Sequence, residues 1–224
     1  MKILMLVNWK VLSCKETPND KQPPDYRVEG EPYWFYRYFN QKDDVDIIDI
    51  SSVSWLENFE REKLRFYVLQ ALKAIPKLHK YDLIVSHGMQ SAVVVCLYRR
   101  FFRGKEKHIV FDIGSFNSAA ESGSALKLMQ FASRSIDGLI YHTSAQHAYY
   151  EKFFPWLVEK SQFVRFGTDG VFWKKETDSK EEIKDAAAVE NSSAPYILCV
   201  GYIKRDWDTL YLSLIHISEP TRRS

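Results

Sequence analysis

Five short apolar runs, each separated from the next by a segment with helical spacing, constrain the fold of this chain most. The runs are rich in Ile, Leu and Val and do not alternate with polar residues, which is typical of strands buried on both faces of a parallel sheet. They cover residues 2–7, 46–50, 83–86, 108–113 and 138–141. The segments with helical spacing cover residues 32–39, 60–78, 89–102, 125–135 and 145–153. Right-handed crossovers between such elements predict a doubly wound, Rossmann-like α/β domain that binds ligands at the carboxyl ends of its strands.

Composition and charge exclude several classes of protein. Of the 224 residues, 46% are hydrophobic and 27% are charged, which excludes a disordered chain and predicts a soluble globular protein. The 31 basic side chains nearly balance the 29 acidic ones, so the formal charge of +2 argues against a nucleic-acid partner. No apolar stretch approaches the roughly 18 residues of a membrane helix. Cys14, Cys96 and Cys199 lack paired metal spacing and fit reduced thiols, so we expect a cytoplasmic protein, with peripheral membrane contact left open.

A change in composition after residue 173 indicates a domain boundary. Residues 174–194 are mostly charged and contain little bulky apolar material, which favours an exposed linker or insertion after a first domain of residues 1–173. Residues 195–211 resume with an apolar strand and the opening of a helix, and they predict the start of a truncated second domain. Residues 212–224 are interpreted as a non-native tail, because Leu212 to Arg222 resembles translated sequencing-adapter sequence.

Candidate site residues follow three of the predicted strands. Asn8 and Trp9 come after the first strand and open a long loop to Gly30, which is interpreted as functional, with a disordered insertion as the alternative. His87 and Gly88 follow the third strand at a helix N-terminus, where anions bind favourably, and a structural role for His87 is equally compatible. Asp112 and Gly114 follow the fourth strand. The carboxylate suits a base or a ligand of sugar hydroxyls, and a turn cap is the alternative.

Several other patterns carry less chemistry. The chain has no G-x-G-x-x-G after the first strand, no phosphate-binding P-loop and no G-x-S-x-G motif. Trp34, Phe35, Tyr38 and Phe39 are interpreted as core, and His142 and His147 as solvent-facing residues beside a helix cap. The aromatic residues of 149–156 are interpreted mainly as packing, with an exposed subset that is able to touch a membrane surface.

The order of several blocks along the chain resembles a known enzyme family. The blocks are Ile136 to Ser144, Phe166-Gly167-Thr168-Asp169 with Phe172, the strand Tyr196 to Gly201, and Arg205 to Leu210. Together with His87-Gly88 and the Asp112 loop, they resemble family-4-like glycosyltransferases of the GT-B fold, also called glycosyl transferases group 1. The resemblance covers nearly all of residues 1–211. Two departures are the absence of a Gly-Gly pair in the first loop and Tyr202 at a position where a basic residue often follows the strand glycine.

The resemblance implies a transferase that moves a sugar from a nucleotide-sugar donor to a glycan or lipid-linked acceptor. The acceptor would lie in the N-terminal domain, with Asp112 and His87 as catalytic residues and Asn8, Trp9, Gly30, Gly88 and Gly114 along its cleft. Gly201, Lys204 and Arg205 would lie near the donor phosphates, and no metal or cofactor is needed. Most of the donor domain would lie beyond residue 211, so the fragment is expected to be inactive alone. The alternatives are a non-catalytic α/β ligand-binding module, or an epimerase or phosphorylase of the same fold.

Overall fold

The computed structural model describes residues 1–39, 43–102, 104–114, 121–165 and 167. The chain divides into one unit of residues 1–167 and a second unit of residues 168–224. The architecture given below is that of the first unit. The expected linker, second domain and tail fall outside the described residues, as do Cys199, Gly201, Lys204 and Arg205.

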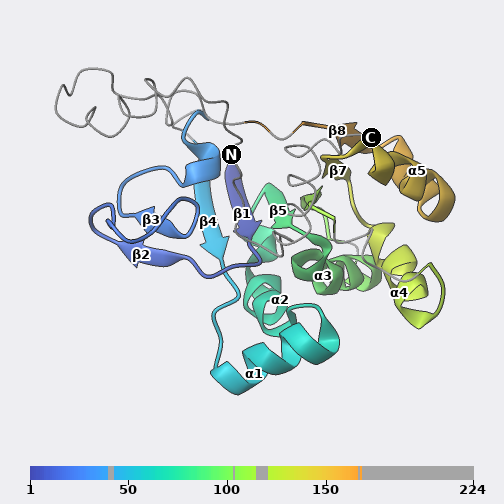
Figure 1. Ribbon diagram of the computed structural model, residues 1–224, viewed down its shortest axis with the longest axis horizontal. Helices are drawn as coiled ribbons and strands as arrows, with labels where there is room; N and C mark the ends of the chain where they lie inside the picture. The colour runs from blue at the N-terminus through green and yellow to red at the C-terminus, as the bar shows by residue number, and fades with distance from the viewer. Residues whose placement is uncertain (40–42, 103, 115–120, 166, 168–224) are drawn as a thin grey trace, which may run out of the picture. The chain divides into compact units, whose positions relative to one another are not determined.

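The centre of the unit is a six-stranded parallel sheet with the order β4-β1-β5-β6-β7-β8 (Figure 1). Its strands are β1 (Lys2–Leu6), β4 (Asp44–Ile48), β5 (Leu83–His87), β6 (Lys107–Asp112), β7 (Gly138–Tyr141) and β8 (Ser161–Phe163). The predicted doubly wound, Rossmann-like sheet is therefore confirmed. From β1 the chain first adds β4 on one side and later adds β5 on the other, so the direction of winding reverses between β1 and β5. Ligands of open α/β sheets bind outside the carboxyl ends of the strands at such a reversal.

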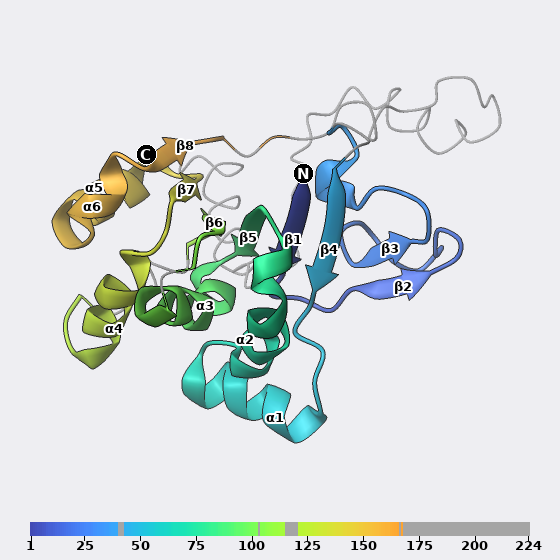
Figure 2. The same ribbon diagram turned by 180° about the vertical axis from the view of Figure 1, so that it is seen from behind.

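Helices cover one face of the sheet, which we call the helix face (Figure 2). They are α2 (Val68–Ala74), α3 (Met89–Phe102), α4 (Ser124–Ser133), α5 (Ser144–Phe153) and α6 (Pro155–Val158). The helix α1 (Ser54–Phe59) precedes them along the chain and has no buried residue. On this face Leu4 and Ile84 pack against α2 and α3. Leu139 packs in a second cluster with Tyr150 and Phe154, which are fully buried.

A single connection, the one from β1 to β4, covers part of the other face, which we call the loop face. It contains the short parallel pair β2 (Leu12–Cys14) and β3 (Tyr26–Val28) and the 3₁₀ turn η1 (Trp34–Tyr36). Tyr33 and Tyr36 are buried against Met5 and Val85. The long loop after β1 is thus an ordered part of the fold, and the alternative of a disordered insertion is wrong.

The predicted helix over residues 32–39 is not formed, apart from the 3₁₀ turn η1. Tyr33 has an extended backbone (φ −63°, ψ 147°), and Tyr33 and Tyr36 alone enter the core. Phe35, Tyr38 and Phe39 are exposed and Trp34 is only partly buried, so the interpretation of these four residues as core is also corrected. The interpretation did not include the two tyrosines that are buried. A run of adjacent aromatic residues places rings on all sides of a helix. It therefore lacks the single apolar stripe that would pack one face of a helix on the sheet.

The predicted long helix over residues 60–78 is divided into three parts. A π-helical turn η2 (Glu60–Leu64) ends at Arg65, which has a left-handed backbone (φ 61°), and α2 follows. The 3₁₀ helix η3 (Ile75–Lys80) then carries Pro76 in its first turn, where a proline ends the preceding α-helix. In contrast, α3 and β7 have the predicted bounds.

Candidate functional site

The residues that follow β1 and β5 meet at the point where the sheet reverses its winding. The Asn8 Oδ1 atom lies 3.3 Å from Nδ1 of His87. The Trp9 and His87 rings pack edge to face, with centroids 4.5 Å apart. Because β1 and β5 are parallel neighbours, their carboxyl ends deliver these three predicted residues to one place.

Three further rings, which the sequence analysis did not single out as ligand contacts, extend this group. Phe35, 41% exposed, lies 6.0 Å from Trp9 and 5.9 Å from His87 between ring centroids. Phe111 stacks between His87 and His142, at 6.4 and 6.5 Å. We call Trp9, Phe35, His87, Phe111 and His142 the carboxyl-edge cluster. His142 is half-buried, so its interpretation as solvent-facing is corrected.

The imidazole of His87 is neutral at pH 7. Burial, and to a smaller extent the positive charge of nearby His142, lowers the pKa of His87 to about 4. Since the Asn8 Oδ1 atom accepts a hydrogen bond, Nδ1 of His87 carries the proton and donates it. Nε2 therefore carries a lone pair, and no hydrogen bond joins it to any of the described residues. The cluster thus presents one hydrogen-bond acceptor surrounded by aromatic faces.

Two glycines shape the backbone beside the cluster. Gly88 (φ 87°) donates its N–H to the Phe111 carbonyl at 2.8 Å and so joins the ends of β5 and β6. Gly114 (φ 104°) donates its N–H to Asp112 Oδ1 at 3.0 Å. Both backbones lie in the left-handed region that favours glycine.

The Asp112 side chain does not reach the carboxyl-edge cluster. Phe111 pairs with His87 across the sheet, so the next residue along β6 points to the opposite, helix face. There the Asp112 carboxylate is fully buried and accepts hydrogen bonds from the Tyr150 hydroxyl and from Gln146 Nε2, the latter at 3.1 Å. Asp112 and His87 thus share one edge of the sheet but lie on different faces.

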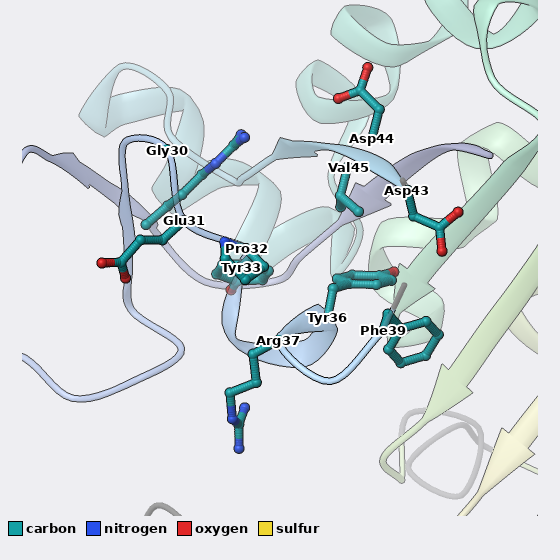
Figure 3. A pocket seen from close by; sticks show the side chains of 11 residues that line it. Gly30, Glu31, Pro32, Tyr33, Tyr36, Arg37, Phe39, Asp43, Asp44 and Val45 are labelled. Atoms are coloured by element: carbon teal, nitrogen blue, oxygen red, sulfur yellow. The ribbon is translucent and has the colours of Figure 1, made fainter. Parts of the chain in front are cut away.

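Gly30 lies in a different part of the fold. It lines a pocket of about 540 Å³ beside the amino end of β4, together with Tyr33, Tyr36 and Asp44 (Figure 3). Burial raises the pKa of both tyrosines. The charged side chains around this pocket have both signs: Arg27, Glu31, Arg37, Asp43 and Asp44. The structure does not bring Gly30 to the carboxyl-edge cluster.

The aromatic residues of 149–156 contribute to packing. Tyr150 and Phe154 are buried, and Tyr149, Phe153 and Trp156 are partly buried against the same core. None of the five is exposed.

The described ranges contain neither a metal site nor a membrane-spanning helix. Within them, no three His, Cys, Asp or Glu side chains are grouped as a metal site would require. No helix in the same ranges has the length and apolar character needed to cross a bilayer.

Protein-family models and curated protein sequences yielded no match. Among solved structures, the chain is similar to Alr3699/HepE from Anabaena, in its complex with UDP and in its complex with UDP and glucose. In both cases the sequence identity is 14%, the TM-score is 0.49, and the alignment covers 85% of this chain and 51% of that chain. The chain therefore spans about half the length of the solved structures it matches.

Proposed function

We propose that residues 1–167 form the acceptor-side domain of a glycosyltransferase that uses a nucleotide-sugar donor. The observation that carries the proposal is the meeting of Asn8, Trp9 and His87 at the reversal point between β1 and β5. The order of motifs along the sequence supports the same family. In this proposal the sugar is transferred to a hydroxyl group of a glycan or a lipid-linked glycan.

The geometry favours an acceptor that offers both a hydroxyl group and an apolar face. Nε2 of His87 has the lone pair needed to accept a hydrogen bond from such a hydroxyl. Rings of the kind found in Trp9 and Phe35 provide flat apolar surfaces for the carbon-bound hydrogens of a sugar. We therefore propose that His87 touches the acceptor hydroxyl and that Trp9 and Phe35 hold the sugar ring.

The lowered pKa of His87 limits what this residue does during transfer. Transfer forms a bond between the acceptor oxygen and the anomeric carbon and breaks the bond to the diphosphate, and the hydroxyl proton passes to the departing diphosphate. A group with a pKa of about 4 is a weak base at pH 7, because the best general bases have a pKa near the working pH. We propose that His87 orients the hydroxyl, and that Asp112 acts on the site indirectly, by holding the Gly114 backbone.

The donor side of the proposal rests on the resemblance alone. It assigns the donor phosphates to Gly201, Lys204 and Arg205, in a second domain of which residues 195–211 would be the start. Cationic side chains and backbone N–H groups stabilise a leaving diphosphate, and this chemistry needs no metal. By this assignment the chain alone should release no nucleoside diphosphate when it is incubated with nucleotide sugars.

Removing the aromatic surface or the imidazole should strongly reduce transfer. In the complete enzyme that contains this domain, we expect Trp9→Ala and His87→Ala each to lower kcat/KM about 100-fold, because a misplaced acceptor loses that much rate. Release of nucleoside diphosphate from a panel of nucleotide sugars, with oligosaccharide acceptors, gives the measurement.

Two matched variants distinguish a site effect from a general one. Trp55 on α1 is 72% exposed and His79 on η3 is also exposed, so Trp55→Ala and His79→Ala should retain the parental rate. A complete enzyme that binds oligosaccharides but never turns over would favour the non-catalytic ligand-binding module. If Trp9→Ala and His87→Ala both retained the parental activity, the acceptor site could not lie at the carboxyl edge of the sheet.

A further inference from the structure

We propose that the opposite, amino edge of the sheet carries a surface that docks on an anionic lipid bilayer. Its centre is a pocket of about 380 Å³ beside the residues where the chain enters β7 and β8. Four cationic side chains line the pocket against one carboxylate: Arg99, Arg100, Arg134 and Lys160 against Asp137. We call this the basic pocket. The proposal goes beyond the transferase function and does not depend on it.

Two of the four cations have structural tasks. Arg99 is buried, and its guanidinium donates hydrogen bonds to the carbonyls of Ser135 and Glu106 and to Asp137, the last at 2.9 Å. Lys160 Nζ donates to the Ile136 carbonyl at 3.0 Å. Basic side chains commonly satisfy carbonyls near helix ends in this way, so these two residues alone would not indicate a ligand.

The other two cations have no such task. Arg100 and Arg134 are exposed, and each stacks on an aromatic ring, Arg100 on Phe131 at 5.1 Å and Arg134 on Trp156 at 4.3 Å. Throughout the described ranges neither guanidinium forms an ion pair with a carboxylate. A guanidinium that stacks on a ring keeps its N–H groups available and held in place for an oxyanion.

Two exposed phenylalanines follow Arg100 along the chain. Phe101 and Phe102, at the end of α3, are each 70% exposed. Phe101 also contacts the ring of Phe131, with centroids 5.8 Å apart. Phe102 stacks on Tyr98, with centroids 4.8 Å apart. Phe101 therefore places exposed apolar surface beside the Arg100–Phe131 pair, and exposed rings grouped with charged residues mark an interaction surface.

Basic and aromatic side chains together suit the surface of an anionic bilayer. Aromatic rings insert at the level of the lipid headgroups, and arginines are attracted to the negative surface potential. Single-stranded nucleic acid also combines cations with rings, but its bases need open ring faces. Here guanidinium groups already cover Phe131 and Trp156, so lipid phosphate is the better match to the basic pocket.

Vesicle sedimentation of the full chain tests the proposal. We expect binding to vesicles that contain phosphatidylglycerol, and little binding to vesicles of phosphatidylcholine alone. The double variant R100E/R134E should lower the partition coefficient at least about 20-fold, given the attraction of each basic residue to such a surface. The double variant F101S/F102S, which retains the charge, should lower it about tenfold.

The control replaces two exposed lysines in the β2–β3 segment, on the other side of the sheet. K15E/K21E changes the net charge as much as R100E/R134E and should bind anionic vesicles like the parent. Equal binding to both vesicle types, or an equal loss in K15E/K21E, would overturn the proposal. So would stabilisation by inorganic phosphate or binding of an oligonucleotide without binding to vesicles. Circular dichroism of each variant verifies the fold. If R100E/R134E does not fold, the loss of vesicle binding expected of F101S/F102S still tests the proposal.

Discussion

Acidification from about pH 7 to about pH 4.5 is expected to lower the free energy of unfolding by about 3 kcal/mol through His108 alone. His108 lies on β6, is fully buried, and has Nε2 2.8 Å from Ser86 Oγ. Burial, and next the positive charge of Arg99, lowers the pKa of His108 to about 3.

The direction of the effect follows from proton binding. In the unfolded chain a histidine binds its proton below about pH 6.5, whereas folded His108 remains neutral down to about pH 3. Between these values the unfolded state binds more protons, so the stability is complete above pH 6.5 and is lost as the pH falls. His87, with a pKa lowered to about 4, acts in the same direction, and its partial exposure makes its share smaller.

Urea unfolding followed by circular dichroism over this pH range gives the measurement. His108→Gln should reduce the slope of stability against pH by up to about 1.4 kcal/mol per pH unit. Ser86→Ala retains the buried imidazole, so it should lower the stability at every pH and leave the slope unchanged. A parental protein that is equally stable at both ends of the range would contradict the prediction.

Gln146→Leu should lower the free energy of unfolding by about 3 to 4 kcal/mol, because it leaves several buried groups without partners. Gln146 Nε2 donates to the Asp112 carbonyl at 2.9 Å and to its carboxylate. Gln146 Oε1 accepts from the backbone N–H groups of His142, at 3.1 Å, and Thr143, at 2.9 Å. Leucine has a similar volume and cannot form any of these bonds.

Gln130→Leu is the matched control for this substitution. Gln130 also lies in a helix, α4, but its side chain is only partly buried and donates a single bond, to the Phe153 carbonyl at 2.9 Å. We expect it to cost about 1 kcal/mol. Urea unfolding at pH 7 compares the two. Equal costs would mean that the Gln146 network does not hold the end of β6.

The main features of the sheet were predictable because buried parallel strands have a strong sequence signal. The run of residues 138–141 and the helical pattern of 89–102 gave the bounds of β7 and α3 as they stand in the structure. The three-residue strands β2, β3 and β8 were missed, because so few residues show no periodicity. No α-helix forms over residues 32–39. A high content of aromatic residues is therefore not enough to distinguish a helix from a turn that two buried tyrosines hold against the sheet.

The sequence predicted those site residues whose place follows from their position directly after a strand. Asn8, Trp9 and His87 follow strands, so the sheet topology brings them together. The side on which Asp112 lies depends on the register between β5 and β6, and a shift of one residue would reverse it. Phe35 joins the cluster through the turn η1, whose position no local pattern in the sequence predicts.

The connection between β1 and β4 combines two tasks in one segment. It closes one side of the hydrophobic core through Tyr33 and Tyr36, and it supplies Trp9 and Phe35 to the cluster. Among the described residues, the helices α2 to α6 of the other crossovers pack on the helix face. If the proposed function holds, exchange of this one segment would change the acceptor preference, while the helices and the order of the strands remain unchanged.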